Sequence, residues 1–510
     1  MTRKKKTAIL FLILLGVALL PLLFLKVWAS YKLGEVNAQQ TAQGALISQE
    51  NTSTEGKNLF EHPLWWDFIK ESHTLYRDEG GITVGAVPAD GAPAPATNAL
   101  SRWKDEQGQK MSHYEFYKPE VDKKVVPRPG NFDSTQRELF PTLESLQKEF
   151  EIVYAEIPDP GLSPIIRKYQ AREDLSDEEK VLAVFQEYFQ SGDPATEAEI
   201  KKSLAESSFF GFSEEMYTKL GVTGEDLLYP VNSLASLKTL ARYYGYTARW
   251  QAYSGQREKT LEELQPLLNL ASLEGYNSTL IEGLVRNAIR AMAANTVHAI
   301  ILENVLNEED LLSIQTRFSR MNMMEDLRQT LEGEEAYCEK MFRVQFDPSL
   351  MKGFWQRAFI RLVHFSGYMD LNKAAIFKAM RALRASIDTE GQTLDYAAWN
   401  KVADMPKSLF NILARQMIPA IGKASNKYLQ IQSHRDVVIL GCALERYRMK
   451  EGSFPEKLEA LIPEYLPQMP TGSLSQGSLS YKPVEGGYEL ILNKLPDLPA
   501  NSRMETIWRR

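Results

Sequence analysis

The spacing of apolar and polar positions changes along the chain, and the first stretch differs most from the rest. Residues 7–25 form an uncharged and strongly apolar run. Nineteen helical residues at a rise of about 1.5 Å span about 28 Å, which is close to the thickness of the hydrocarbon core of a bilayer. The pattern therefore predicts one N-terminal transmembrane helix, with the lipid bilayer as a partner through residues 7–25.

Charged residues beside this run predict its orientation. Four basic residues lie at positions 3–6, whereas Lys26 alone follows the run directly. Because basic residues favour the cytoplasmic side, we expect a single-pass protein of the inner (cytoplasmic) membrane with a cytoplasmic N-terminus. The C-terminal body would then be periplasmic or extracellular. The alternative is a signal peptide cleaved after residue 29, which would export the same body.

The helical part of the chain follows the 3-4 spacing of amphipathic helices. This spacing is clearest over residues 281–292. Residues 232–254 and 258–273 form two further helical segments joined at Gly255-Gln256, which predicts an antiparallel helical hairpin. Because no second copy of the hairpin occurs at a fixed period, an irregular helical bundle is favoured over a tetratricopeptide solenoid.

The last part of the chain changes its pattern again. Gly452-Ser-Phe-Pro455 interrupts a long helix, and a short helix is expected at residues 456–462. Residues 479–481 and 488–492 then alternate at period two around Glu485-Gly-Gly487, which predicts a β-hairpin.

The predicted fold class is therefore mainly α. It comprises an N-terminal single transmembrane helix, an exported irregular helical bundle and a small C-terminal α+β tail with a β-hairpin. Polar or Gly/Pro-rich stretches separate these parts. The predicted segments are a basic stub with the anchor (1–32), a flexible tether (33–57), a short helix at 59–76 with an irregular segment (58–133), a helical domain (134–436), and a long helix end plus tail (437–510).

The tail resembles the C-terminal part of the major pseudopilin of type II secretion. In that family a long helix ends in a Tyr and is followed by a Gly-x-Tyr-Pro turn, a short helix and a small sheet. Tyr447, Gly452, Phe454 and Pro455 occupy these places, with Phe in place of the second Tyr. The family's N-terminal processing site is missing, so the resemblance does not imply assembly into a pilus. Residues 493–497 hold a single carboxylate, so calcium binding is not implied either.

A longer resemblance is to uncharacterised membrane-anchored helical proteins of planctomycete and verrucomicrobial type. These proteins combine one transmembrane helix, an exported helical domain and the same pseudopilin-like tail. The matching blocks are residues 234–242, 284–290 and 418–420, together with the tail. The resemblance implies this architecture but no activity.

Composition narrows the class of protein. With 44% apolar and 25% charged residues, the chain is neither disordered nor polytopic in a membrane. The net charge of −7 argues against nucleic-acid binding, which needs a surplus of basic residues on one face. Five of the 59 basic residues and none of the 66 acidic ones lie in residues 1–26, so the exported part is more acidic than the average suggests.

Candidate catalytic chemistry is sparse. The six His residues form no His-Glu-x-x-His motif, and the chain carries no nucleophile elbow or Walker A loop. His62, Asp67 and His73 make the one His–carboxylate cluster, on the first exported helix, and they are the candidates for a metal or acid–base site. The sequence itself indicates no cofactor.

Tyr243, Tyr246, Trp250 and Tyr253 recur at 3-4-3 spacing and therefore share one face of a helix. Such a face could stack on the sugar rings of a glycan. Packing between helices explains the same stripe more simply.

Cys338 and Cys442 could form one disulfide in an oxidising exterior, or remain two separate buried thiols. Three Glu residues at positions 332, 334 and 335 would raise the pKa of Cys338 and oppose its use as a nucleophile.

These patterns together favour a membrane-anchored, exported bacterial envelope protein with a non-enzymatic interaction or scaffolding role. The tail suggests a setting near a secretion or pilus-like apparatus, with an envelope protein of unknown identity as the partner. The alternative is an envelope hydrolase or glycan-binding enzyme whose site is assembled from distant segments.

Overall fold

A computed structural model of the chain is mainly helical, with three small sheets in the part that it describes. The described residues are 30–32, 34, 56–66, 69, 172, 194–212, 216, 219, 230–275, 278–345, 353–395, 411–470, 479–492 and 506–509. The helices are η1 (Leu59–Glu61), α7 (Pro194–Glu206), α9 (Pro230–Tyr253), α10 (Arg257–Ser272), α11 (Leu280–Leu302), α12 (Glu308–Ser319), α13 (Met323–Gln345), α14 (Phe354–Phe365), α15 (Tyr368–Ala385), α17 (Ile412–Glu451) and η5 (Leu458–Leu461). The strands are β1 (Phe209–Phe210), β2 (Glu274–Gly275), β3 (Ile387–Asp388), β4 (Thr393–Leu394), β5 (Leu479–Val484), β6 (Gly487–Leu492) and β7 (Thr506–Arg509).

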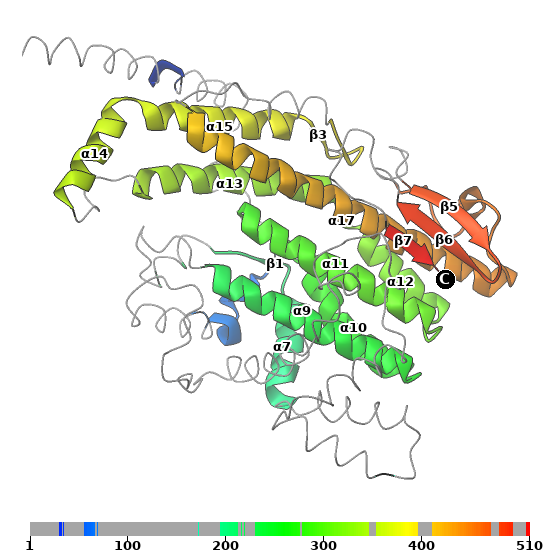
Figure 1. The fold of residues 1–510 in the computed structure, drawn as a ribbon. Coiled ribbons are helices and arrows are strands. Elements are labelled where there is room, and N and C mark those ends of the chain that lie inside the picture. Colours follow the sequence, from blue (N-terminus) through cyan, green and yellow to red (C-terminus); the bar gives the residue numbers. More distant parts are fainter. Residues whose placement is uncertain are drawn as a thin grey trace, which may run out of the picture.

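Helix α17 is the centre of the bundle. It has 40 residues and contacts α11, α12, α13 and α15 along its length (Figure 1). Every residue from Tyr428 to Arg446 is buried, and these include charged as well as apolar side chains. A helix that is buried all round lies in a core rather than at a surface. The predicted boundary between residues 436 and 437 falls inside this helix, so the two predicted segments share one core element.

The α9–α10 pair forms the predicted helical hairpin and packs against α11. The chain reverses direction at Gly255, whose φ of 68° lies in the left-handed region that glycine adopts readily. Helix α7 contacts α10 on the outer side of the hairpin. The hairpin is confirmed, because its two helices begin and end within two residues of the predicted bounds.

Helix α11 confirms the helix expected over residues 281–292 but not the face that its apolar spacing suggested. Ile281 is 48% exposed, whereas Arg286, Asn287 and Arg290 are buried. Polar groups on neighbouring elements bind Arg286 and Arg290. The pattern of hydrophobic positions in the sequence gives no information about such partners.

The tail begins where α17 ends. Gly452 adopts a φ of 79°, and its N–H donates to the carbonyl of Arg448 at 2.8 Å, which closes the last turn. The ring of Phe454 then packs at 5.0 Å from the ring of Tyr488 on β6. The short helix expected at 456–462 is a 3-10 helix at residues 458–461.

Strands β5 and β6 form the predicted antiparallel hairpin, with Val484 opposite Gly487 across the turn. Strand β7 adds to the free edge of β6 and makes a three-stranded sheet that the sequence did not predict. This sheet and α14 lie at opposite ends of the molecule (Figure 1).

The remaining sheets are two-stranded. β1 pairs with β2 in parallel, and β3 pairs with β4 in antiparallel orientation. The segment at residues 56–66 packs beside β1, where the ring of Phe60 lies 5.6 Å from that of Phe210 and 4.9 Å from that of Phe212. This contact joins residues 56–66 to the helical body.

Within the described part of the chain, no helix has both the length and the apolarity needed to cross a bilayer. Residues 7–25, which carry the predicted anchor, lie outside the described residues. So do most of the predicted tether at 33–57 and most of the predicted irregular segment up to residue 133.

Candidate functional site

The predicted His–carboxylate cluster is described only in part. His62 follows η1, and its backbone N–H donates to the carbonyl of Leu59 at 3.2 Å. Its Nε2 lies 3.7 Å from Oε1 of Glu199 on α7. Asp67 and His73 lie outside the described residues. The structure therefore places His62 in the contact between residues 56–66 and α7.

The same contact is fixed by a buried tryptophan. Trp65 is fully buried, and its Nε1–H donates to the hydroxyl of Ser203 on α7 at 3.1 Å. Asn58 donates to the carbonyl of Gly211 at 3.0 Å. Among the residues that the structure describes, no group of three or more His, Cys, Asp and Glu side chains is placed to hold a metal ion.

The aromatic face of α9 runs from the core to the surface. Tyr243 is 3% exposed, Tyr246 and Trp250 are half-buried, and Tyr253 is 38% exposed. The hydroxyl of Tyr243 donates to Glu197 on α7 at 3.5 Å, so this end of the stripe belongs to the helix packing.

Next to Tyr243, three glutamates surround one lysine. Lys201 Nζ lies 3.2 Å from Glu197, 3.3 Å from Glu262 and 2.9 Å from Glu263. Burial alone would lower the pKa of Lys201, but its hydrogen bond to Glu263 and the nearby carboxylate charges raise it above the usual value. The lysine stays charged and joins α7 to α10. The i, i+4 spacing of Glu197 and Lys201 was the only sign of this cluster in the sequence.

A second network lies deep between α11 and α13. Asp326 accepts from Arg286 at 2.7 Å and from Arg290 at 2.6 Å. Arg286 also donates to Thr330 at 3.1 Å, and the Thr330 hydroxyl lies 2.8 Å from that of Tyr428 on α17. Burial would raise the pKa of Asp326, but the two guanidinium charges outweigh this effect and hold it below the usual value.

Helices α13 and α15 are joined by a third network. Glu335 accepts from Arg381 at 2.8 Å and from Arg384 at 2.6 Å. Its side chain is only 4% exposed. Each of these clusters pairs opposite charges across two helices. This arrangement fixes the relative position of the helices.

The two cysteines are free and buried, which is the second of the two alternatives that the sequence left open. Burial raises the pKa of both thiols well above the usual range, and Glu334 adds to this effect at Cys338. The thiolate form that nucleophilic chemistry requires is therefore disfavoured at both positions.

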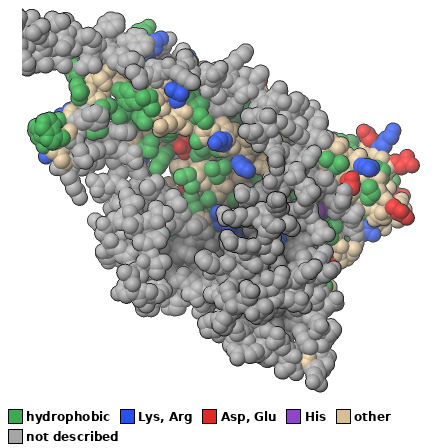
Figure 2. All heavy atoms as spheres, in the orientation of Figure 1, with side chains coloured by type: hydrophobic (Ala, Val, Ile, Leu, Met, Phe, Trp, Pro, Cys, Tyr) green, Lys and Arg blue, Asp and Glu red, His purple; other side chains and the backbone are tan. Residues whose placement is uncertain are grey.

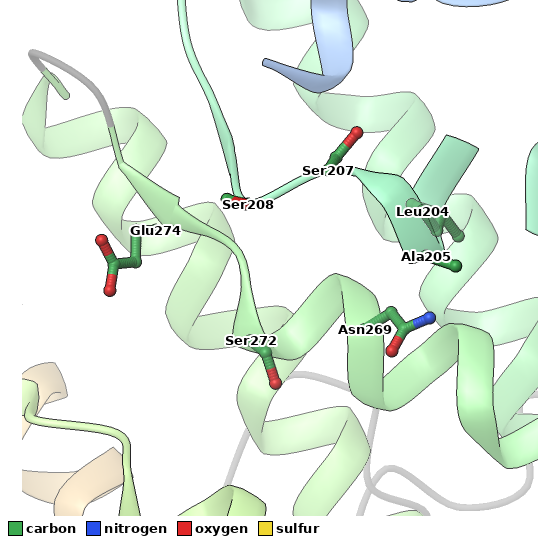
Figure 3. A pocket seen from close by; sticks show the side chains of 7 residues that line it. All are labelled: Leu204, Ala205, Ser207, Ser208, Asn269, Ser272 and Glu274. Carbon is green, nitrogen blue, oxygen red and sulfur yellow. The ribbon is translucent and has the colours of Figure 1, made fainter. Parts of the chain in front are cut away.

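A shallow pocket of about 310 Å³ lies between α7, α10 and β2 (Figure 3). The hydroxyls of Ser207 and Ser272, which line it, each donate at 2.7 Å to a carbonyl in the preceding helical turn. The side-chain oxygen of Asn269 accepts from Arg317 at 2.9 Å. Glu274 and Asn269 lie on opposite sides of this pocket. Ser207 and Ser272 are therefore hydrogen-bonded to the surrounding backbone, and Asn269 is hydrogen-bonded to α12.

Helix α14 differs from these sites because four of its large apolar side chains face outward. Phe354 is 69% exposed, Trp355 82%, Leu362 49% and Phe365 41%. Val363 faces the core instead. Figure 2 shows hydrophobic side chains gathered at the end of the molecule where α14 lies. The one signal of this helix in the sequence is that residues 354–365 combine aromatic and basic residues without one acidic residue.

Comparison with known proteins found no matching family model, no matching curated protein and no matching solved structure. The resemblance of the tail to the pseudopilin family remains a prediction.

Proposed function

We propose that this protein is a membrane-anchored, exported envelope protein with an interaction or scaffolding role. In this proposal residues 7–25 hold the chain in the membrane. The helical bundle is a rigid body outside the membrane, and α14 presents its interaction surface.

The outward face of α14 carries the proposal. Burying one large apolar side chain contributes about 1.5–3 kcal/mol, so exposing several on one helix forgoes a large stabilisation. Phe354, Trp355, Leu362 and Phe365 are all exposed on this short helix. Contiguous exposed apolar surface of this kind is typical of a binding surface.

The buried charge networks support the scaffolding role. Asp326 with its two arginines joins α11 to α13, and Glu335 with Arg381 and Arg384 joins α13 to α15. Breaking such buried pairs is costly, so the helices are held in one arrangement. A body of fixed shape can hold a binding surface at a defined distance from its anchor.

The sequence supports the envelope setting. Basic residues at positions 3–6 precede the apolar run, and the following chain is acidic. The turn at Gly452 and Phe454 resembles that of the major pseudopilin, which suggests a position near a secretion or pilus-like apparatus.

Site-specific crosslinking in cells tests the proposal. A photo-crosslinking amino acid replaces Trp355 in the full chain, and a matched variant carries it at Leu312, which is 43% exposed on α12. We expect the chain in the membrane fraction to resist carbonate extraction. We also expect a reproducible crosslinked product from position 355, to protein or to lipid and identified by mass spectrometry, and none from position 312.

Two results would overturn the proposal. One is release of the chain by carbonate, which would remove the anchor. The other is a membrane-bound chain that gives no product at position 355 with crosslinkers of different reach.

A further inference from the structure

The face of α14 has a defined composition. At about 100° per residue, Phe354, Ala358, Leu362 and Phe365 lie on one side of the helix, and Trp355 borders them. All five are exposed. The opposite side carries Val363, which packs against the core. The helix therefore presents one continuous apolar face to its surroundings.

Positive charge flanks this face. Arg357 and Arg361 are exposed, and at helical spacing they lie beside Phe354 and Phe365 on one edge of the apolar arc. Residues 354–365 contain no Asp or Glu. This local excess of positive charge stands out in a chain with a net charge of −7. It favours a partner with negative charge next to apolar material.

The position of α14 brings it toward the proposed membrane anchor. α14 lies at the end of the bundle remote from the β5–β7 sheet. Residues 30–32, which are helical and follow a few residues after the apolar run, lie toward this same end of the molecule (Figure 1). If the run spans a bilayer, the surface of that bilayer lies near the end of the bundle that carries α14.

We infer that α14 is an interfacial helix that inserts its apolar face into an anionic lipid surface. Trp and Phe partition to the boundary between headgroups and acyl chains, while arginines at the edge bind lipid phosphates. The inference rests on the proposed function, because it takes the lipid surface to be the partner of the surface described there. The helix then fixes the orientation of the bundle relative to the membrane.

The test uses the full chain reconstituted into vesicles, with an environment-sensitive dye on a cysteine at position 358 (A358C). The native thiols are buried and stay unlabelled in the folded chain. The same dye at Lys482→Cys, an exposed position on β5 at the other end, is the matched control. The vesicles contain phosphatidylcholine alone or with phosphatidylglycerol, and flotation shows whether the chain is inserted.

We expect a blue-shifted emission at position 358 in vesicles with phosphatidylglycerol, and quenching by nitroxides placed at shallow depth in the lipid. The control position should show neither. R357Q/R361Q should abolish the difference between the two lipid compositions. F354S/W355S should lower the ratio of inserted to water-exposed dye at least about 100-fold, because it removes two large apolar contacts. Circular dichroism of each variant checks its fold, and none of these substitutions touches the core.

Three outcomes are distinguishable. A dye that remains in water on an inserted chain overturns the interfacial helix and leaves the anchor in place. A chain that does not float with any vesicle overturns the proposed function as well. A blue shift that depends on protein concentration, without dependence on lipid composition, shows that a second copy covers α14 and overturns the inference.

Discussion

Neutralising Asp326 should destabilise the protein far more than neutralising the glutamate beside it. In D326N the two guanidinium groups of Arg286 and Arg290 keep their burial but lose their counter-charge, which lies 2.7 and 2.6 Å away in the native chain. Removing one partner from a buried ion pair costs about 3–5 kcal/mol. For 510 residues that unfold together, at an unfolding entropy of about 2 cal/mol/K per residue, a loss of this size corresponds to a fall in Tm of about 3–5 °C.

Glu325 provides a matched control on the same helix. It pairs with Arg328 at 2.6 Å, but its side chain is 33% exposed and that of Arg328 is 37% exposed. An exposed pair contributes at most about 1 kcal/mol. Thermal unfolding of D326N and E325Q, followed by circular dichroism of the full chain in detergent, measures the difference. Equal Tm values for the two variants would refute the argument from burial.

The same residue predicts a dependence on pH. The pKa of Asp326 is lower in the folded state, so its ionised form adds stability above the ordinary pKa of about 3.9. This stability is lost as the pH falls through the lower pKa of the folded state. We therefore expect the wild-type chain to lose stability over this acidic range, and D326N to lack this part of the loss.

Three further predictions concern buried positions elsewhere in the bundle. G283A should destabilise the chain, because a Cβ at this position would lie 2.0 Å from the hydroxyl of Tyr428. Thermal unfolding should show a partial recovery of Tm in the G283A/Y428F double variant, which lacks this hydroxyl. Cys338 and Cys442 should not react with a thiol reagent at pH 8 in the folded chain but should both react in denaturant, and rapid reaction without denaturant would contradict their burial. Burial lowers the pKa of His434 to about 4, so the stability of the chain should fall as the pH drops from about 6.5 toward 4. Urea titrations at several pH values should show that H434L loses this dependence on pH. An unchanged dependence would exclude His434 as its source.

Local patterns in the sequence were sufficient for several elements of the fold. The hairpin of α9 and α10, the end of α17 at Gly452 and the β5–β6 hairpin were all expected at these positions. The reason is that turns of this kind need a positive φ, which glycine adopts readily, and that helical and extended segments have different apolar periods. Both signals depend on neighbouring residues alone.

Local patterns in the sequence did not predict the charged residues of the core. Arg286 and Arg290 belong to the side of α11 that its polar residues would assign to solvent, yet both are buried. Both can be buried because they donate to Asp326 across the contact between α11 and α13. Asp326 lies 40 positions after Arg286 and 36 positions after Arg290. A sequence window around either arginine does not contain this partner.

The sequence by itself determined the mainly α class of the fold, the α9–α10 hairpin, α11 and the β5–β6 hairpin, because these depend on spacing within a few residues. It also determined the apolar run at residues 7–25 and its basic flank. The tertiary structure decided which face of each helix is buried, because neighbours distant in the sequence supply the contacts. The apolar face of α14 is an example, because the fold turns it outward and not toward the core.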